Sequence, residues 1–535
     1  MARSSKSIDL WQRAADAVGR RTRYWLRTLR GTRPPAVEAA WRRLIACARD
    51  DGLSPTCGTS AVCPGLTAAA IPTLRNFGDA DRAWHYARRL LQWQKRDGSL
   101  PDAGLLHSSL FNTAQAARAW AVSVDDGALP EAEPALRRAC GYLVGRICED
   151  GTVRLPEGGG SFDRWAPPPV HLAGLATAAE HARRHGIAGW RSQIGRAIDR
   201  LLRTSDCALI DVPTHIAAHG LEAIMDLSDE DPRTIAAAIR GLESAAVRQR
   251  RDGSIPIDGS HRWTSSAGLA HLTALWFRAG MQPIASKGLE CLIARQADDG
   301  GWPGSWGRGA AFFPHSNSNW TIKYFLDAAA AQVAHEFDDP EPGLSVPLAT
   351  GDGRWEAARR WAAEVPDGGV CVDVGCGGGR FLSALAREFP RLEWSGIDPS
   401  ATLLKNVPAG IDTTRGNLLR LPIPDARCSA ALCIEALEHS LLPERAVDEL
   451  CRIVHPGGRV LIVDKCARFQ GLSECKPWER WFTPESVSHW LAKHCDDVTC
   501  EPLPTGPHQR TPGLFLTWRG VRRAKPTGLA VRRAA

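Results

Sequence analysis

A recurring Asp-Gly phrase most strongly constrains the fold of residues 36–337. In each copy an apolar helical run is followed by charged residues, by Asp-Gly, by an irregular stretch and by another helix. Copies stand at Asp51, Asp97, Asp150, Asp252 and Asp299, and Ser205-Asp206 occupies the place of a sixth. A period of about 50 residues with two helices in each unit indicates an array whose units bury their apolar faces on their neighbours.

Apolar residues at helical spacing divide this region into twelve predicted helices, which form six hairpins. Asp and Gly end an outer helix in each hairpin, because Gly adopts the left-handed conformation that a helix C-terminus needs. The predicted helices span 36–49, 66–76, 79–96, 112–124, 131–149, 170–186, 189–204, 213–227, 231–250, 265–279, 282–297 and 318–336.

Three copies of the phrase carry a Gln before the Asp, at residues 90–100, 245–255 and 292–302. They resemble the Gln-x-x-Asp-Gly-Ser repeat of the squalene-cyclase and prenyltransferase superfamily, over about 300 residues. The resemblance implies an all-α (α/α)6 toroid. The Asp-x-Asp-Asp acid of the terpene cyclases is missing, and the sequence shows no convincing zinc ligand set, so we expect no metal. We interpret residues 36–337 as a recognition or scaffolding domain.

The predicted inner helices should converge on one face through their N-termini, which carry polar and aromatic residues. A ring of helix N-termini favours an anionic ligand, and tryptophans can stack on sugar rings. The alternative is that each Asn, Thr or His only caps its own helix. The candidate substrate residues are His107, Asn112, His171, His215, His261, Trp263, Asn317, Asn319 and Trp320, and His315 lies beside them.

After a Pro-rich linker at residues 338–352, the pattern changes to that of an α/β domain, predicted at 353–518. Val370–Val374 is a buried-strand pattern that runs into a Gly-rich turn and a helix at 380–388. The next strand ends at Asp398, and an acid at this place can accept hydrogen bonds from ribose hydroxyls. A dinucleotide-binding site begins in a similar way, so this unit alone does not define the ligand.

Four further phrases follow in order along the domain. They are Asp398, Leu421–Asp425, Leu437–His439 and Pro456–Gly458, after the turn of Asp373–Gly379. Together they resemble the class I S-adenosylmethionine-dependent methyltransferases, in particular the small-molecule branch. The resemblance implies a doubly wound, Rossmann-like α/β sheet and S-adenosyl-L-methionine as cofactor.

The resemblance also implies roles for individual residues in the cofactor site. Gly375, Gly377 and Gly379 let the backbone approach the cofactor, Asp373 holds its amino-acid end and Asp398 takes both ribose hydroxyls. The family has an Asp after the third strand for the adenine amino group, where this chain has Asn417. An amide oxygen can accept that hydrogen bond, although more weakly than a carboxylate.

Methyl transfer to a hydroxyl needs alignment and a group that removes the proton. His439 is the first candidate base, since an imidazole with a pKa near 6.5 suits neutral pH. Glu435 and Glu438 are the alternatives. Trp478 and Trp481 precede a predicted helix start at Thr483, and they form either the wall of the acceptor pocket or ordinary core.

These observations predict a methyltransferase that O-methylates a carbohydrate or glycan intermediate with help from the toroid. A second interpretation is methylation of a terpenoid, peptide or polyketide natural product. A third is a non-catalytic scaffold or cofactor sensor. The acceptor atom, the general base and the oligomeric state stay open.

The formal net charge of +7 is concentrated at the two ends of the chain, residues 1–35 and 519–535, and the body between them is net acidic. We therefore expect no nucleic-acid partner. Residues 8–30 form an amphipathic, arginine-rich pattern that fits either an interfacial helix on anionic lipid or a helix docked on the protein itself. The 16 cysteines include no CxxC pair, and no apolar run approaches the roughly 20 residues that cross a bilayer. These features predict a cytoplasmic protein, with peripheral contact at the inner face of the membrane as one interpretation.

Overall fold

The computed structural model describes residues 35–58, 61–204, 211–338, 348, 351–470, 475–504 and 511–524. The chain divides into two compact units, one of Pro34–His335 and one that includes Glu336–Ala535. The predicted amphipathic segment at 8–30, nearly all of the predicted linker, Ser205-Asp206 and residues 525–535 lie outside the described residues. No helix in the described ranges has the length and apolar character of a membrane span.

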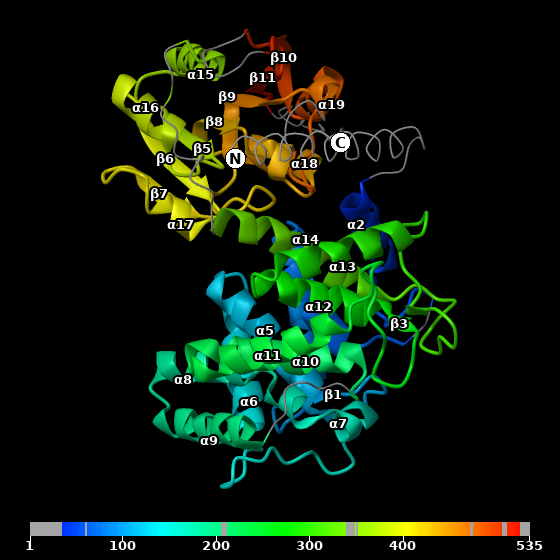
Figure 1. The fold of residues 1–535 in the computed structure, drawn as a ribbon. Helices are drawn as coiled ribbons and strands as arrows, with labels where there is room; N and C mark the ends of the chain where they lie inside the picture. The colour runs from blue at the N-terminus through cyan, green and yellow to red at the C-terminus, as the bar shows by residue number, and fades with distance from the viewer. Residues whose placement is uncertain are drawn as a thin grey trace, which may run out of the picture. The chain divides into compact units, whose positions relative to one another are not determined.

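The first unit is helical, and all twelve predicted helices are present with shifted ends (Figure 1). The predicted helix at 170–186 begins later, because Pro167–Pro169 favour a short 3-10 turn and Gly174 has a φ of 79°. The helices are α2 (Ala36–Cys47), α3 (Pro64–Asn76), α4 (Ala80–Trp93), α5 (Leu110–Asp125), α6 (Glu133–Val144), the short α7 (Ser161–Trp165), α8 (Leu175–His185), α9 (Ala188–Thr204), α10 (Thr214–Asp226), α11 (Arg233–Val247), α12 (Ser266–Arg278), α13 (Gln282–Arg295) and α14 (Asn319–Asp338).

The Gln of the repeated phrase joins one outer helix to the beginning of the next. Its side-chain amide donates to a main-chain carbonyl there: Gln94 to Ala135 on α6 (2.8 Å), Gln249 to Ile284 on α13 (3.0 Å) and Gln296 to Ala36 on α2 (2.9 Å). The last of these bonds connects the final repeat to the first helix. The same type of contact therefore occurs between neighbouring repeats and between the last repeat and α2.

The Gly of the phrase is required by close backbone approach. A Cβ at Gly300 would lie 2.2 Å from the carbonyl oxygen of Ala39 on α2, and one at Gly253 would lie 2.1 Å from that of Lys287 on α13. Both glycines have a φ of 84°, which other residues rarely adopt. The repeat thus sets how closely successive outer helices pack.

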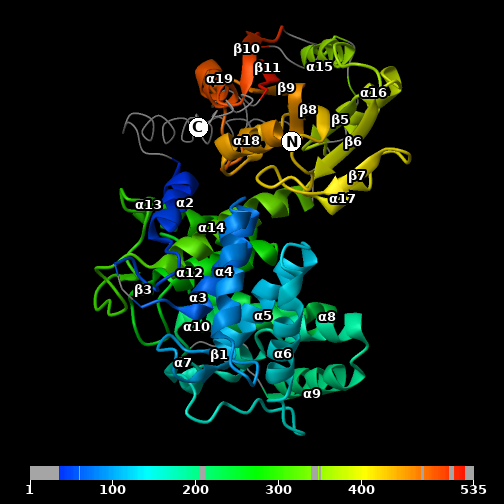
Figure 2. The same ribbon diagram turned by 180° about the vertical axis from the view of Figure 1, so that it is seen from behind.

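The second unit is built on one seven-stranded sheet of order β10-β11-β9-β8-β5-β6-β7 (Figures 1 and 2). The five strands from β9 to β7 are parallel, and β11 and β10 add an antiparallel edge. The strands are β5 (Val370–Val374), β6 (Glu393–Asp398), β7 (Asp412–Arg415), β8 (Cys428–Ile434), β9 (Val454–Lys465), β10 (Cys495–Pro502) and β11 (Phe515–Arg522). This is the Rossmann-like fold of the methyltransferases.

Helices and one apolar core complete this unit. The helices are α15 (Gly353–Ala363), α16 (Arg380–Glu388), α17 (Ala401–Leu404), α18 (Pro443–Ile453) and α19 (Pro484–Ala492). Trp361 of α15 and Leu385 of α16 pack on Leu461 and Val463 of β9, all of them almost fully buried. Because β11 continues to Arg522, the sheet includes the first residues that the charge pattern assigned to the basic tail.

Candidate functional site

The Gly-rich turn lies where the strand order of the sheet reverses. Strand β5 has β6 on one side and β8 on the other, and ligands of open parallel sheets bind at the carboxyl end of such a strand. The backbone N–H groups of Gly375 and Cys376 donate to Ile397 O at 2.7 and 3.1 Å. A Cβ at Gly375 would lie 2.3 Å from the Cβ of Ala436, so only Gly lets the turn pass the end of β8.

Asp398 is fixed against this turn. Its Oδ2 accepts from the N–H of Gly377 (2.9 Å) and its Oδ1 accepts from the N–H of Ser400 (2.9 Å). A Cβ at Gly377 would meet no atom within 4 Å, so the turn is open to a ligand on that side. Gly379 has a φ of 78° and precedes the first residue of α16. The glycines of the turn, Asp398 and the first residue of α16 thus lie together at one edge of the sheet. This arrangement fits a nucleoside whose ribose hydroxyls are unmodified.

Asp373 lies inside β5 and is buried beside Asp398. Burial, and then the negative charge of Asp398, raise the pKa of Asp373 to about 7. Asp373 therefore holds a proton up to near-neutral pH, whereas Asp398 keeps backbone donors on both oxygens.

Asn417 does not have the geometry expected for an adenine contact. Its Oδ1 accepts from the N–H groups of Leu419 (2.8 Å) and Arg420 (3.1 Å). An amide oxygen has two lone pairs, so these bonds occupy it. The loop is nevertheless near the ribose acid, because Gly416 N donates to Asp398 O. Asn417 shapes this loop through a local turn, which the sequence comparison could not distinguish from ligand binding.

Two arginines that the sequence analysis did not single out hold Glu435. Arg354 Nη1 lies 2.6 Å and Arg380 Nη2 3.0 Å from Glu435 Oε1. Glu435 has a φ of 53°, a strained conformation for a residue other than Gly and one that is common at functional sites. With its carboxylate committed to two cations, Glu435 is poorly placed to take a proton from an acceptor.

Glu438 is a buried carboxylate that belongs to a second group of charged residues at this edge of the sheet, together with Asp464 and Lys465. Its Oε1 binds Lys465 Nζ at 2.9 Å, its N–H donates to Asp464 Oδ2 at 3.0 Å, and its side chain is nearly inaccessible. Oε2 has no hydrogen-bond partner among the described residues. Burial, followed by the charge of Asp464, raises the pKa of Glu438 well above its usual value.

His439 is also buried, so the pKa of its ring differs from the expected value. Burial lowers the pKa of His439 to about 4, so the ring is neutral at pH 7 and the premise of a pKa near 6.5 is wrong. The indole N–H of Trp478 donates to Nδ1 (3.3 Å), and Nε2 lies 3.5 Å from Glu438 Oε1. Both nitrogens therefore face protein groups, which favours a positioning role for His439.

The two predicted aromatic residues lie in different surroundings. Trp478 is partly exposed, whereas Trp481 is buried and donates its indole N–H to Glu479 Oε2 (3.2 Å). Lys465 Nζ lies 5.4 Å from the centre of the Trp481 ring. Thr483 caps the N-terminus of α19, which confirms the predicted helix start. Trp481 therefore supports the charged group, and Trp478 is the better candidate for a pocket wall.

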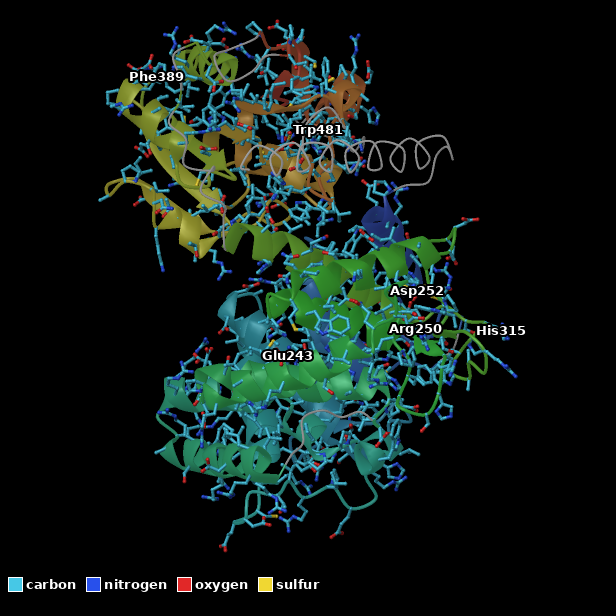
Figure 3. The ribbon with its side chains drawn as sticks, viewed as in Figure 1. Glu243, Arg250, Asp252, His315, Phe389 and Trp481 are labelled. Carbon is cyan, nitrogen blue, oxygen red and sulfur yellow. The ribbon has the colours of Figure 1, made fainter. Side chains whose placement is uncertain are left out.

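In the helical unit, several predicted substrate residues instead fix loops. His107 and His261 are exposed, and their Nδ1 atoms lie 3.2 and 2.9 Å from Asp102 and Asp258. The amides of three asparagines donate to other segments: Asn112 to Pro101 O (2.7 Å), Asn317 to Asp299 Oδ2 (2.7 Å) and Asn319 to Ser54 O (2.9 Å). These amides bond to other segments and do not cap their own helices. His315 is exposed on its loop (Figure 3), and Trp263 is partly buried.

The remaining predicted residues are more deeply placed. His171 Nε2 donates to Asp163 O (3.0 Å), and burial lowers the pKa of its ring. Burial also lowers the pKa of His215 to about 4, and this ring stacks on Phe312. Trp320 lies against Phe111, His219 and Tyr324. Trp320 thus marks an aromatic centre that the sequence analysis did not identify in full.

That centre contains a charged cluster on α10, α12 and neighbouring helices. Glu222 lies 3.1 Å from Arg118 Nη2 and 3.3 Å from His271 Nε2; Glu222 and His271 are buried, whereas Arg118 is partly exposed. His271 stacks on Tyr324 with ring centres 3.8 Å apart. Burial lowers the pKa of His219 and of His271, so both are neutral partners. His219, Glu222 and His271 also place ligand atoms within 4.8 Å of one another. The adjacent arginine already neutralises the carboxylate.

Comparison with known proteins agrees with the second unit. Residues 372–462 match the model of a family described as a methyltransferase domain. The chain is 29% identical to an Arabidopsis thaliana tRNA (carboxymethyluridine(34)-5-O)-methyltransferase over 183 residues, which are 32% of this chain and 44% of that protein.

Two bacterial proteins are similar over the same part. The ubiquinone/menaquinone biosynthesis C-methyltransferase UbiE of Syntrophotalea carbinolica is 28% identical, over 21% of this chain and 51% of its own length. The fatty-acid O-methyltransferase of Mycolicibacterium smegmatis is 28% identical, over 26% of this chain and 54% of its own length. The chain therefore spans about half the length of the curated relatives that it matches.

Proposed function

We propose that this chain, whose residues 372–462 belong to an S-adenosylmethionine-dependent methyltransferase domain, methylates a hydroxyl oxygen of a carbohydrate or glycan intermediate. The observation that carries the proposal is Glu438, a buried carboxylate with an unpaired Oε2 in the loop that follows β8. The names of two relatives specify O-methyl transfer, which supports oxygen as the acceptor atom.

The cofactor supplies a methyl group that its sulfonium has already activated. The chain's part is to hold the nucleoside and to present the acceptor in line. Asp398 is the residue for the two ribose hydroxyls, and the turn of Gly375–Gly379 lets the backbone approach. Arg354 and Arg380 fix Glu435 beside the turn, and Asp352 is a second carboxylate partner of Arg354.

Glu438 is the base that the geometry favours. A carboxylate whose pKa is raised by burial can take a proton from a hydroxyl more readily than an ordinary one. Lys465 keeps Oε1 in place, and Oε2, which is buried and has no hydrogen-bond partner among the described residues, would meet the acceptor once the loop that carries Glu438 moves. His439 orients Glu438 from the other side, and Trp478 fixes the ring of His439.

We propose further that residues 36–337 form an α/α toroid that helps to hold the acceptor. The bond from Gln296 to Ala36 supports closure of the helical array. Trp320, which is partly exposed and is backed by the buried rings of Phe111 and Tyr324, offers an aromatic face on which a sugar can stack. The charged residues around Glu222 would bind polar groups of the same molecule.

The other acceptors are separable by experiment. A terpenoid, peptide or polyketide product remains the second interpretation, and a cofactor-sensing scaffold the third. A tRNA becomes a candidate because five relatives are named as tRNA methyltransferases. Cell extract should be incubated with the protein and methyl-labelled cofactor and then fractionated into glycan, lipid, peptide and RNA.

Label in the glycan fraction with wild type and with Asp412→Ala, but not with Asp398→Ala, supports the proposal. Asp412 is exposed on β7 and serves as the control. Label found only in the RNA fraction or only in the lipid fraction would contradict the glycan acceptor and identify RNA or lipid in its place. S-adenosylhomocysteine binding without transfer to any fraction favours the scaffold.

A further inference from the structure

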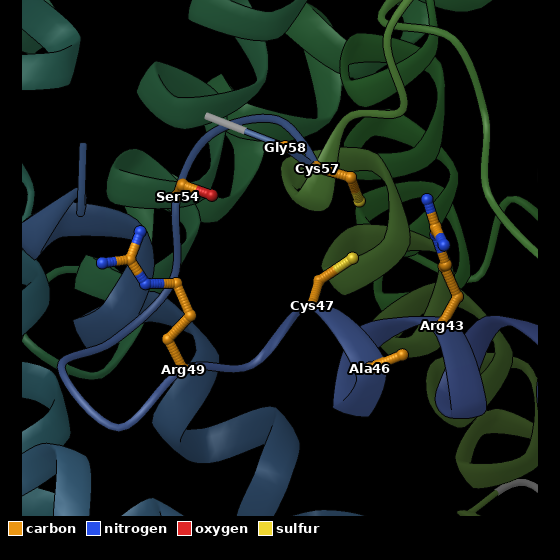
Figure 4. A pocket seen from close by; sticks show the side chains of 7 residues that line it. All are labelled: Arg43, Ala46, Cys47, Arg49, Ser54, Cys57 and Gly58. Atoms are coloured by element: carbon orange, nitrogen blue, oxygen red, sulfur yellow. The ribbon is translucent and has the colours of Figure 1, made fainter. Parts of the chain in front are cut away.

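An open cavity of about 400 Å³ lies in the helical unit at the C-terminal end of α2 (Figure 4). It is lined by Arg43, Ala46, Cys47, Arg49, Ser54, Cys57 and Gly58. The side chains of Cys47 and Cys57 point toward one another across it (Figure 4). Both thiols are partly accessible. Two thiols thus share one solvent-connected site.

The second thiol is held firmly by the last repeat. Cys57 N donates to Asn317 O (2.9 Å), and Thr56 pairs with Ser318 in an isolated bridge. In its thiol form, Cys57 donates to Asn319 Oδ1, which lies 3.2 Å from Sγ. Cys47 is the last residue of α2. The two sulfurs therefore come from a helix end and a strand-like segment that are both anchored.

A cation lies beside the pair. Arg43 precedes Cys47 by one helical turn, and its Nη2 pairs with Asp299 at 3.2 Å. Its Nε is buried and has no hydrogen-bond partner in the described part of the chain. A hydrogen bond from Cys47, and then the charge of Arg43, lower the pKa of Cys57 to about 7. The pKa of Cys47 is raised, mainly by the same bond. One thiol is thus activated and its neighbour stays protonated, the arrangement typical of a reactive and a resolving cysteine.

The chain contains a second close pair with the same electrostatic pattern, because a hydrogen bond from Cys451, and then the charges of Arg522 and Arg523, lower the pKa of Cys495. Cys451 Sγ and Cys495 Sγ are 3.8 Å apart, and the two residues are 0% and 1% exposed. No hydroperoxide can reach sulfurs so enclosed without opening of the domain. Proximity of two thiols is therefore common to both pairs, and access is what distinguishes them.

We propose that Cys57 is a modification site for hydroperoxides and that Cys47 resolves the product as a disulfide. The Cys57 thiolate attacks one peroxide oxygen, the O–O bond breaks, and hydroxide or alkoxide leaves with the electron pair. Cys57 is then a sulfenic acid. The Cys47 sulfur attacks it, the S–O bond breaks, and water leaves with the proton of Cys47. The two thiols are oxidised by two electrons, and the hydroperoxide is reduced.

The test is peptide mapping of the full chain after brief exposure to hydrogen peroxide, with dimedone present to trap sulfenic acid. Trypsin cleaves after Arg49, which separates the two cysteines and makes a disulfide visible as a linked pair. Wild type should give the Cys47–Cys57 link, and Cys47→Ser should give a dimedone adduct on Cys57. Cys451→Ser is the matched control and should leave the link unchanged.

Rates provide the second measurement. Cys500 is a partly accessible thiol whose pKa burial raises to about 11, and it serves as the internal reference. Cys57 should be oxidised at least tenfold faster than Cys500, and Arg43→Gln should reduce that advantage with unchanged far-ultraviolet circular dichroism. Equal rates at Cys57 and Cys500, a first adduct on Cys47, or a link only between Cys451 and Cys495 would each overturn the proposal.

Discussion

Asp398 Oδ2 accepts a 2.9 Å hydrogen bond from the backbone N–H of Gly377. The acid at the end of β6 and the turn after β5 are therefore one rigid arrangement, formed before a ligand arrives. Preorganisation of this kind lowers the ordering cost of binding.

Replacing Asp398 should remove most of the cofactor affinity. Hydrogen bonds to a charged group contribute about 1.5–3 kcal/mol, so Asp398→Ala should weaken S-adenosylhomocysteine binding by tenfold or more. Titration calorimetry measures this directly, and Asp412→Ala, on the exposed neighbouring strand, should bind as wild type does. Unchanged affinity of Asp398→Ala would place the ribose elsewhere.

Replacing Glu438 should affect turnover and spare cofactor binding. Loss of a general base costs about 10²- to 10⁴-fold in rate, so Glu438→Gln should fall in this range and His439→Gln should fall less. Since the pKa of Glu438 is raised, wild-type transfer should rise with pH through that pKa, and this limb should vanish in Glu438→Gln. Glu485→Gln, exposed on α19, is the control. A larger defect in His439→Gln would reverse the assignment.

Asp373 should make the stability of the ligand-free protein depend on pH. Its folded pKa is about 7 and its unfolded value is about 3.8, so the folded state binds the extra proton between these values and stability falls as pH rises through this window. Asp373→Asn should therefore gain thermal stability relative to wild type from pH 5 to pH 8, whereas Asp412→Asn should not. If the melting temperatures of Asp373→Asn and Asp412→Asn changed equally between pH 5 and pH 8, the raised pKa of Asp373 would be contradicted.

The contacts of Glu222 with Arg118 and His271 should contribute to stability. Glu222→Gln removes the carboxylate and leaves Asp226 as the partner of Arg118 at 3.3 Å, which should cost about 1–3 kcal/mol. Glu243→Gln, exposed on α11 (Figure 3), should change the free energy of unfolding by less than about 0.5 kcal/mol. Denaturant unfolding compares them, and equal midpoints would show that the cluster is solvated.

The bond between Gln296 and α2 should be separable by mutation from the equivalent bond between two neighbouring repeats. Gln296→Ala removes the bond to Ala36, whereas Gln249→Ala removes the equivalent bond to Ile284. Hydrogen exchange of residues 36–47 should accelerate in the first variant alone. Equal exchange of this segment in both would mean that α2 is held by its other contacts.

Local patterns predicted much of this molecule, because helix periodicity, the Asp-Gly phrase and the Gly-rich turn are all encoded over short stretches. The centre of the helical unit was not predictable in the same way. His219 and Glu222 lie on α10 and His271 on α12, each within an apolar helix and without a motif. Their common surroundings arise only when the helices pack.

The same reason explains the differences at the methyltransferase site. The pKa of His439 depends on burial, and the oxygen of Asn417 is committed to its own loop. Arg354 reaches Glu435 from 81 positions away. The pKa of His439 and the contact of Arg354 arise only when distant segments pack, whereas the turn of Asn417 is local and typical of its residue type.

The bond between Gln296 and Ala36 also orders events during protein synthesis. A ribosome makes about 5 to 20 residues per second, so α2 emerges on the order of ten seconds or more before the residue that binds its first carbonyl. Until then the bond from Gln296 to Ala36 cannot form. Of the three Gln contacts of the repeat, this one joins the segments that are made furthest apart in time.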